Sequence, residues 1–217
     1  EYSVCFADFQ TQGRGRGSNQ WLSPYGSGIC FSVIGSLSSK SSPLGLSIYC
    51  GIAIARALRD LGYAGVSLKW PNDLLHGGNK LGGILVELTT QSQDYYSFNI
   101  GVGINYNLGS DLNSMDQNLF PPTDLLKINH DLSLCRSEMS GILARTVIES
   151  LKKYNQRSMQ SAFKLWPEFD ALFQKEVKIF EEGDIIEGKN IGIDDSGALL
   201  LDENGVINKV YNGHLVI

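Results

Sequence analysis

Apolar positions recur along this chain with two periods, and the places where the period changes mark the predicted elements. Runs rich in β-branched and aromatic residues predict strands. Apolar residues spaced three or four apart predict helices. The strands are expected at residues 4–7, 27–36, 65–70, 80–90 and 95–107, and the helices at 46–61, 133–154 and 158–173. The first strand is expected to be buried, because it lies in a mostly apolar run.

The order of these elements predicts an α+β fold with a mixed, mainly antiparallel sheet and helices packed on it. Polar residues at 91–94 predict a hairpin between two long strands. Residues 108–131 are polar and show no period, so a long loop is expected there. From residue 174 onward, short strands alternate with turn signals. We therefore expect two domains, residues 1–173 and a small β-barrel at 174–217.

Composition and charge exclude several classes of function. The 217 residues carry a formal net charge of −5, which argues against a general affinity for nucleic acid or anionic membranes. No apolar run is long enough to span a bilayer, and no signal peptide opens the chain, so a cytoplasmic location is expected. The four cysteines lack metal spacing and are expected to be buried, reduced thiols. The three histidines are expected in loops or turns, too scattered for a metal cluster or a catalytic triad.

The segment "TQGRGRGSNQW", residues 11–21, places two arginines among glycines between two predicted strands. Arginine offers a fork of donors that suits carboxylate or phosphate. The segment lacks the lysine of a P-loop and the third glycine of the dinucleotide fingerprint. It is either a plain surface loop or a flap that closes over an anionic ligand, and its place between core strands favours the flap.

The segment "LKWPNDLLHGGNKLGGILVE", residues 68–87, gathers polar groups at strand ends. Lys69 either extends into solvent or points its charge into a pocket. Asn72 and Asp73 either form a turn or supply oxygen ligands for Mg²⁺. Lys80 begins the next strand, and Gly83 allows the backbone to approach a ligand closely.

The segment "NIGVGINYN", residues 99–107, has glycines at alternate positions of a strand, Gly101 and Gly103. One face of that strand is therefore bare, and either a neighbouring backbone or a flat ligand must pack there. Asn105 either binds a ring or caps a turn.

Together, in this order, "GRGRGSNQW", "KWPNDLL…NKLGGILVEL" and "NIGVGINYN" resemble the catalytic domain of biotin protein ligases. The segment after residue 174 is similar to the small SH3-like module that ends those enzymes. The resemblance implies a class II synthetase-like catalytic fold and two reactions. Biotin and ATP would give biotinyl-5′-AMP and pyrophosphate, and a lysine of a biotin carboxyl carrier domain would then accept the biotin.

The resemblance also implies roles for individual residues. Arg16, Lys69 and Lys80 would be catalytic, with Lys69 holding the biotin carboxylate. Asp73 would also bind Mg²⁺, and Phe120 falls where some members stack an aromatic ring on adenine. The implied biotin-binding residues are Gln10, Gly13, Arg14, Gly15, Arg16, Lys69 and Gly83. The implied ATP-binding residues are Arg14, Arg16, Trp21, Asn72, Asp73, Lys80, Asn105 and Phe120.

Members of the family begin with a Ser/Thr-rich biotin-binding segment, and this chain starts after the place where it would lie, so we expect preceding residues to be missing. No helix-turn-helix precedes the catalytic region, and DNA binding is not expected from this chain. A homodimer is a hypothesis. The alternatives are a lipoate-type ligase, a non-catalytic biotin or adenylate sensor, and an Arg/Gly RNA-binding protein, which the acidic net charge disfavours.

Overall fold

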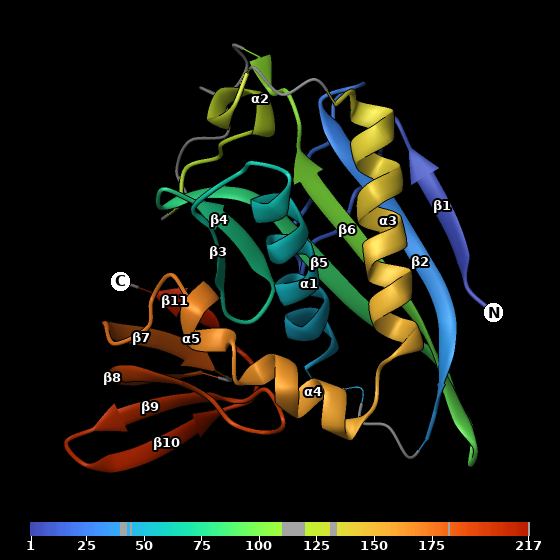
Figure 1. The fold of residues 1–217 in the computed structure, drawn as a ribbon. Helices are drawn as coiled ribbons and strands as arrows, with labels where there is room; N and C mark the ends of the chain where they lie inside the picture. Colours follow the sequence, from blue (N-terminus) through green and yellow to red (C-terminus); the bar gives the residue numbers. More distant parts are fainter. Residues whose placement is uncertain (40–42, 44, 110–119, 131–133, 182, 217) are drawn as a thin grey trace.

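The computed structural model describes residues 1–39, 43, 45–109, 120–130, 134–181 and 183–216. It contains a six-stranded sheet, helices packed on that sheet, and a separate five-stranded sheet near the carboxyl end (Figure 1). All paired strands in both sheets are antiparallel, and isolated bridges supply the parallel pairings among the described residues. The predicted α+β class is confirmed.

The six-stranded sheet has the order β1-β2-β6-β5-β4-β3. Its long central strands are those that the period-two pattern predicts. The strands are β1 Ser3–Ala7, β2 Gly28–Ser38, β3 Val66–Lys69, β4 Asp73–His76, β5 Asn79–Gln91 and β6 Tyr95–Asn105.

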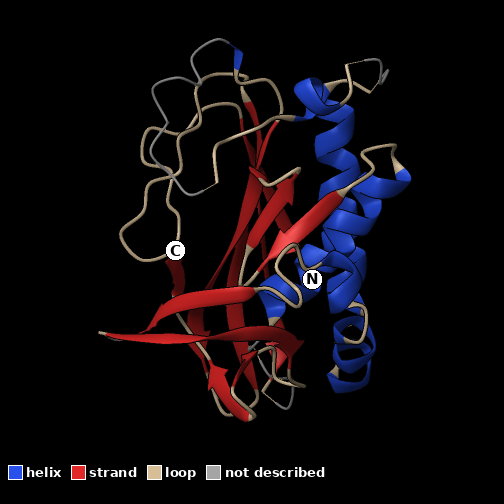
Figure 2. Ribbon diagram, turned by 90° about the vertical axis from the view of Figure 1, so that its left-hand side faces the viewer, coloured by secondary structure: helices blue, strands red, loops and turns tan. Residues whose placement is uncertain are grey.

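Helices cover one face of this sheet, as Figure 2 shows, while loops gather on the other side. Alternate residues of β6, from Tyr96 to Ile104, are buried in the same core cluster as the apolar residues of α1 and α3. The intervening residues of β6, including Asn99, Gly101 and Gly103, therefore lie on the opposite face. The helices are α1 Leu46–Asp60, α2 Leu125–Ile128, α3 Arg136–Lys152, α4 Gln156–Phe163 and α5 Trp166–Phe169.

The five-stranded sheet has the order β10-β9-β8-β7-β11, and we call it the C-terminal sheet. Within the residues described, β10 and β11 are its two edges and are not paired with each other, so the expected closed barrel is not seen. Its strands are β7 Glu176–Glu181, β8 Asp184–Ile193, β9 Leu199–Glu203, β10 Val206–Val210 and β11 His214–Val216.

Several local expectations were wrong. The strand predicted as buried, β1, is an edge strand, with Phe6 53% exposed. The single helix predicted at 158–173 is two helices, and Pro167 stands in the first turn of the second one. The segment predicted as a long loop at 108–131 contains α2, and its residues 110–119 and 131 lie outside the described part of the chain.

Smaller corrections concern single side chains. Cys5 and Cys135 are exposed rather than buried, whereas Cys30 and Cys50 are buried as expected. His76 and His214 belong to strands rather than to loops. The residue at the start of α3 in the N-cap position is Cys135, and Ser133, the expected cap, lies outside the described residues.

Candidate functional site

Two lysines and one aspartate meet where β3, β4 and β5 adjoin. The Lys69 Nζ lies 2.6 Å from the Asp73 Oδ2, and the Lys80 Nζ lies 2.8 Å from the Asp73 Oδ1. The side chains of Lys69 and Asp73 are only 14% and 10% exposed. Lys69 therefore turns inward, and the alternative in which it extends into solvent is excluded.

Strand pairing explains how these residues meet. Lys69 is the last residue of β3, and it pairs with Asp73, the first residue of β4. Asp73 in turn pairs with Gly83 of β5, where an added Cβ would lie 3.6 Å from the Asp73 Oδ1. The short hairpin between β3 and β4 thus places the carboxylate between two cations. Asn72 and Asp73 do not simply form a turn, because Asp73 begins a strand and the Asn72 Nδ2 donates to the Ile84 carbonyl at 3.0 Å.

The charge balance of this cluster is positive. Burial alone would raise the pKa of the Asp73 carboxyl, but the Lys69 and Lys80 ammonium groups outweigh burial and hold that pKa below its usual value. Burial lowers the pKa of the Arg16 guanidinium, and the Asp73 charge offsets part of that effect. One carboxylate therefore faces several cations, an arrangement that attracts an anionic ligand.

The Gly/Arg loop, residues 9–27 between β1 and β2, is paired with itself. The Trp21 N–H donates to the Gly13 carbonyl at 2.9 Å, and the Gly15 N–H donates to the Asn19 carbonyl at 2.8 Å. A Cβ on Gly13 would lie 2.2 Å from the Trp21 carbonyl oxygen, so this position requires glycine. Gln10 lies in the stem of the loop and bridges to Ser23.

The two arginines of the loop diverge. Arg14, whose side chain is 68% exposed, forms an ion pair with Glu87 of β5 at 2.7 Å. Arg16 instead donates to the Gly213 carbonyl at 3.1 Å and to the Asn212 Oδ1, between β10 and β11. The loop is thereby held at one point by the large sheet and at another by the C-terminal sheet.

Trp21 supplies the group that packs on the bare face of β6. A Cβ on Gly103 would lie 2.5 Å from the Trp21 ring, so the ring rests directly on the glycine backbone. The expected partner was a backbone or a ligand, and the structure shows an aromatic side chain of the same chain. Gly101 has room for a Cβ, with the Leu85 carbonyl oxygen 3.8 Å away.

A pocket of about 170 Å³ lies between the two sheets. Arg16, Asn72 and Leu85 line it from the large sheet and its loop. Gly197 and Tyr211 line it from the C-terminal sheet. A concave space with a cation at its edge is typical of a small-ligand site.

Two further residues predicted for ATP contact the lysines of the cluster around Asp73, which does not itself line this pocket. The Phe120 ring centre lies 5.0 Å from the Lys69 Nζ. Asn105 is buried, and its Nδ2 donates to the Thr123 carbonyl at 2.9 Å and to the Lys80 carbonyl at 3.3 Å. Asn105 thus joins the end of β6 to the start of β5, and only its amide oxygen is left to meet a ligand.

Sequence reasoning missed the partners of the loop arginines. A period-two reading of β5 places Glu87 on the same strand face as Gly83, but it does not show that Arg14 reaches that face. Asn212 lies in a turn far along the chain, and no local pattern connects it to Arg16.

Within the described chain, no group of three His, Cys, Asp or Glu side chains is arranged to hold a metal ion. None of the helices described is both long and apolar enough to cross a bilayer.

Comparison with known proteins gives consistent matches along the chain. Residues 1–105 match the Biotin/lipoate A/B protein ligase family, and residues 173–214 match the Biotin protein ligase C terminal domain. The chain is 32% identical over 213 residues to the bifunctional ligase/repressor BirA of Escherichia coli, covering 98% of this chain and 65% of that protein. The chain thus spans somewhat less than two thirds of that relative.

Two more distant similarities agree with this match. The human biotin–protein ligase is 29% identical over 215 residues, covering 93% of this chain and 28% of that protein. The biotin protein ligase of Aquifex aeolicus, solved with biotin and ATP, superposes with a TM-score of 0.81 at 29% identity, covering 98% of this chain and 87% of that one.

Proposed function

Because this chain belongs to the biotin/lipoate A/B protein ligase family, we propose that it is an ATP-dependent biotin protein ligase. The observation that carries the proposal is the cluster in which Lys69 and Lys80 share Asp73. A carboxylate and a nucleoside triphosphate repel each other as they approach, because both are negatively charged. A site with excess positive charge lowers that repulsion and stabilises the charge that develops in the transition state.

The proposed chemistry has two steps. An oxygen of the biotin carboxylate attacks the α-phosphorus of ATP, and the bond to the β-phosphate oxygen breaks, giving biotinyl-5′-AMP and pyrophosphate. The neutral ε-amino group of an acceptor lysine then attacks the acyl carbon of this anhydride. An amide forms, AMP leaves, and the amine proton passes to solvent.

The roles proposed for single residues are those that the family resemblance implies. Lys69, Lys80 and Arg16 would face the carboxylate and the phosphates. Their support is the low exposure of Lys69 and the effect of the Asp73 charge on Arg16. We propose Gln10, Gly13, Arg14, Gly15 and Gly83 as further biotin contacts, and Arg14, Trp21, Asn72, Asp73, Asn105 and Phe120 as contacts on the nucleotide side.

A direct Mg²⁺ ligand is the weakest of these roles. Both oxygens of Asp73 face lysine ammonium groups, surroundings that repel a divalent cation. A magnesium ion would therefore have to arrive with the ATP phosphates, which are its usual ligands.

The carrier and the assembly are also proposals. The acceptor would be a biotin carboxyl carrier domain, and residues 174–217 would form a module separate from the catalytic domain at 1–173. The reaction would take place in the cytoplasm, where cysteines such as the four free ones here stay reduced.

A homodimer is testable by gel filtration with and without biotin plus ATP, and a monomer under both conditions would exclude it.

The experiment that tests the proposed activity is ATP–pyrophosphate exchange with biotin and with lipoate in parallel. Exchange only with biotin is the expected result. Exchange only with lipoate would keep the mechanism and change the substrate. Binding of biotin without exchange would favour the sensor, in which the cations hold a ligand and do no chemistry.

A further inference from the structure

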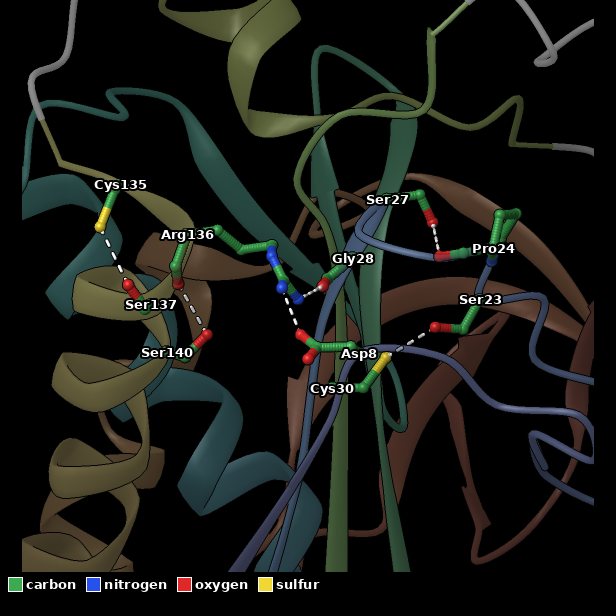
Figure 3. A network of polar contacts seen from close by, with 10 residues as sticks. All are labelled: Asp8, Ser23, Pro24, Ser27, Gly28, Cys30, Cys135, Arg136, Ser137 and Ser140. Carbon is green, nitrogen blue, oxygen red and sulfur yellow. Dashed lines mark hydrogen bonds and ion pairs between the residues drawn. The ribbon is translucent and has the colours of Figure 1, made fainter.

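Arg136, the first residue of α3, reaches both ends of the Gly/Arg loop (Figure 3). One guanidinium nitrogen, Nη2, pairs with the Asp8 Oδ1 just before the loop. The other, Nη1, donates to the Gly28 carbonyl at 3.2 Å, where β2 begins after the loop. A single planar side chain therefore bridges the two ends of the loop's stem.

Backbone hydrogen bonds hold the same stem. The Gly26 N–H donates to the Asp8 carbonyl at 3.0 Å. The Ser27 carbonyl accepts from the N–H groups of Tyr106 and Asn107, both at 2.9 Å. The stem is thus tied to the segment that follows β6, and its geometry fixes the direction in which Gln10 and the arginines leave the sheet.

The helix that carries Arg136 is itself fixed. Its apolar face, including Met139, Leu143 and Val147, is fully buried in the core. Its amino end is capped, because the Cys135 N–H donates to the Glu138 Oε2 at 2.8 Å. Arg136 therefore connects a rigid, core-packed helix to a loop whose tip is held through long arginine side chains.

We propose that Arg136 is a positioning residue. It holds the stem of the Gly/Arg loop, so that the tip of the loop faces the ligand in one orientation. It touches no reacting group in this role. Its effect on catalysis rests on the function proposed above, whereas its effect on the order of the loop does not. Asp8 is its charged partner, and the carbonyl of Gly28 is the second anchor.

The test combines trypsin cleavage with kinetics, in Arg136→Ala, Arg136→Lys and Asp8→Asn. Trypsin cleaves after Arg14 and Arg16, and cleavage after Lys189 in β8 reports unfolding of the C-terminal sheet. Arg136→Ala is expected to raise the rate at the loop bonds about tenfold relative to the Lys189 bond, because cleavage follows the population of the open form. Arg136→Lys is expected to be intermediate, since one ammonium cannot reproduce the fork of a guanidinium. Asp8→Asn is expected to be intermediate as well, because it keeps an acceptor oxygen but loses the charge.

The kinetic readout is the exchange reaction. Arg136→Ala is expected to raise the KM for biotin about tenfold, because a loop that is less well positioned binds its ligand less often in the productive geometry. Arg145→Ala, on the exposed side of the same helix, is the matched control and is expected to change neither readout.

Equal acceleration at the loop bonds and at Lys189 would overturn the proposal, because it would show a general loss of stability. Unchanged cleavage at the loop in Arg136→Ala would overturn it too. If the wild-type protein shows no exchange at all, the proposed function fails, and the cleavage pattern still decides the role of Arg136.

Discussion

The sequence position of Lys69 does not determine where its side chain points; its neighbours in the fold do. A lysine at a strand end ordinarily turns its ammonium toward water. Here the hairpin partner is Asp73, and a carboxylate at 2.6 Å holds the ammonium in the site. The low exposure of both groups means that solvent screens the pair poorly, so the charge of Lys69 remains effective toward a ligand.

Removing this charge is expected to abolish most of the adenylation. In Lys69→Ala, the rate of biotin-dependent ATP–pyrophosphate exchange should fall about 100-fold or more, because a fixed cation near the developing charge is lost. The unfolding transition should stay single and cooperative, since Lys80 still pairs with Asp73. Lys178→Ala, which breaks the exposed pair with Glu187, is the control and should retain full exchange. An unimpaired Lys69→Ala would mean that the lysine serves only to neutralise Asp73.

The residues of this cluster were within reach of sequence reasoning, whereas the partners of the loop were not. Lys69 and Asp73 are close neighbours in the chain, so a hairpin alone brings them together. Glu87 and Asn212 meet the loop arginines only through sheet register and the packing of two sheets. Such long-range contacts leave no periodic signal in the sequence.

Strand β6 shows how one element serves the core and the site together. One face buries apolar side chains against the helices, and the other leaves backbone exposed at Gly103 for the Trp21 ring. The close approach of the ring fixes the end of the Gly/Arg loop above the sheet. The glycine is therefore needed for packing within the chain, before any ligand is considered.

Gly103→Ala should destabilise the fold by about 1–3 kcal/mol, because a Cβ 2.5 Å from the Trp21 ring forces the ring to move. Urea unfolding followed by tryptophan fluorescence measures both the free energy and the displaced ring. Gly101→Ala is the control for the free energy of unfolding, because its Cβ would make an ordinary contact at 3.8 Å. Equal free energies of unfolding for the two variants would contradict the packing described here.

The turn between β8 and β9 is built around Asp194. Its Oδ1 accepts from the N–H and the hydroxyl of Ser196, at 2.8 and 2.6 Å, and its Oδ2 pairs with the Lys209 Nζ at 2.9 Å. Burial alone would raise the pKa of Asp194, but the hydrogen bonds from Ser196 and Lys209 outweigh burial and lower the pKa from 3.8 to about 2. The turn is therefore stabilised by the charged form of this carboxylate.

The lowered pKa of Asp194 makes the stability of the fold depend on pH in one direction. The pKa of Asp194 is lower in the folded state than in the unfolded state. Its contribution to the free energy of unfolding is therefore present above pH 3.8 and is lost as the pH falls toward about 2. Asp194→Asn should therefore lower the free energy of unfolding at pH 6, and the difference from wild type should shrink between pH 4 and pH 2. Urea titrations at several pH values measure the difference in the free energy of unfolding between the two proteins. A difference that does not change with pH would disprove the role of the Asp194 charge.

The elements that the sequence predicted well are the long ones. β5, β6, α1 and α3 are long and strongly periodic, and all were expected. β4 and α2, each four residues long, were missed, whereas β3, which is equally short, was expected. The exposure of β1 was not visible either, since the burial of a strand depends on how many neighbours it has in the sheet.

At the scale of the whole molecule, the C-terminal sheet adjoins the strand that carries Lys69. The Trp70 Nε1 donates to the Gly197 carbonyl at 3.0 Å, and the Ala171 N–H donates to the Leu68 carbonyl at 2.8 Å. The neighbouring Asp170, whose pKa burial raises, accepts from the Asn190 Nδ2 of β8 at 2.8 Å. The change in sequence pattern at residue 174 predicted a second module, but its contact with the residue next to Lys69 is seen only in the structure.

Formation of an acyl-adenylate from biotin is the reaction proposed for this chain. The most direct measurement is a single-turnover reaction of the protein with biotin and ATP, followed by separation and mass determination of the products. We expect equal amounts of biotinyl-5′-AMP and pyrophosphate from the wild type. We expect the rate to fall about 100-fold in Lys80→Ala, in which one cation of the cluster is missing. Binding of both substrates without formation of the adenylate would exclude this reaction.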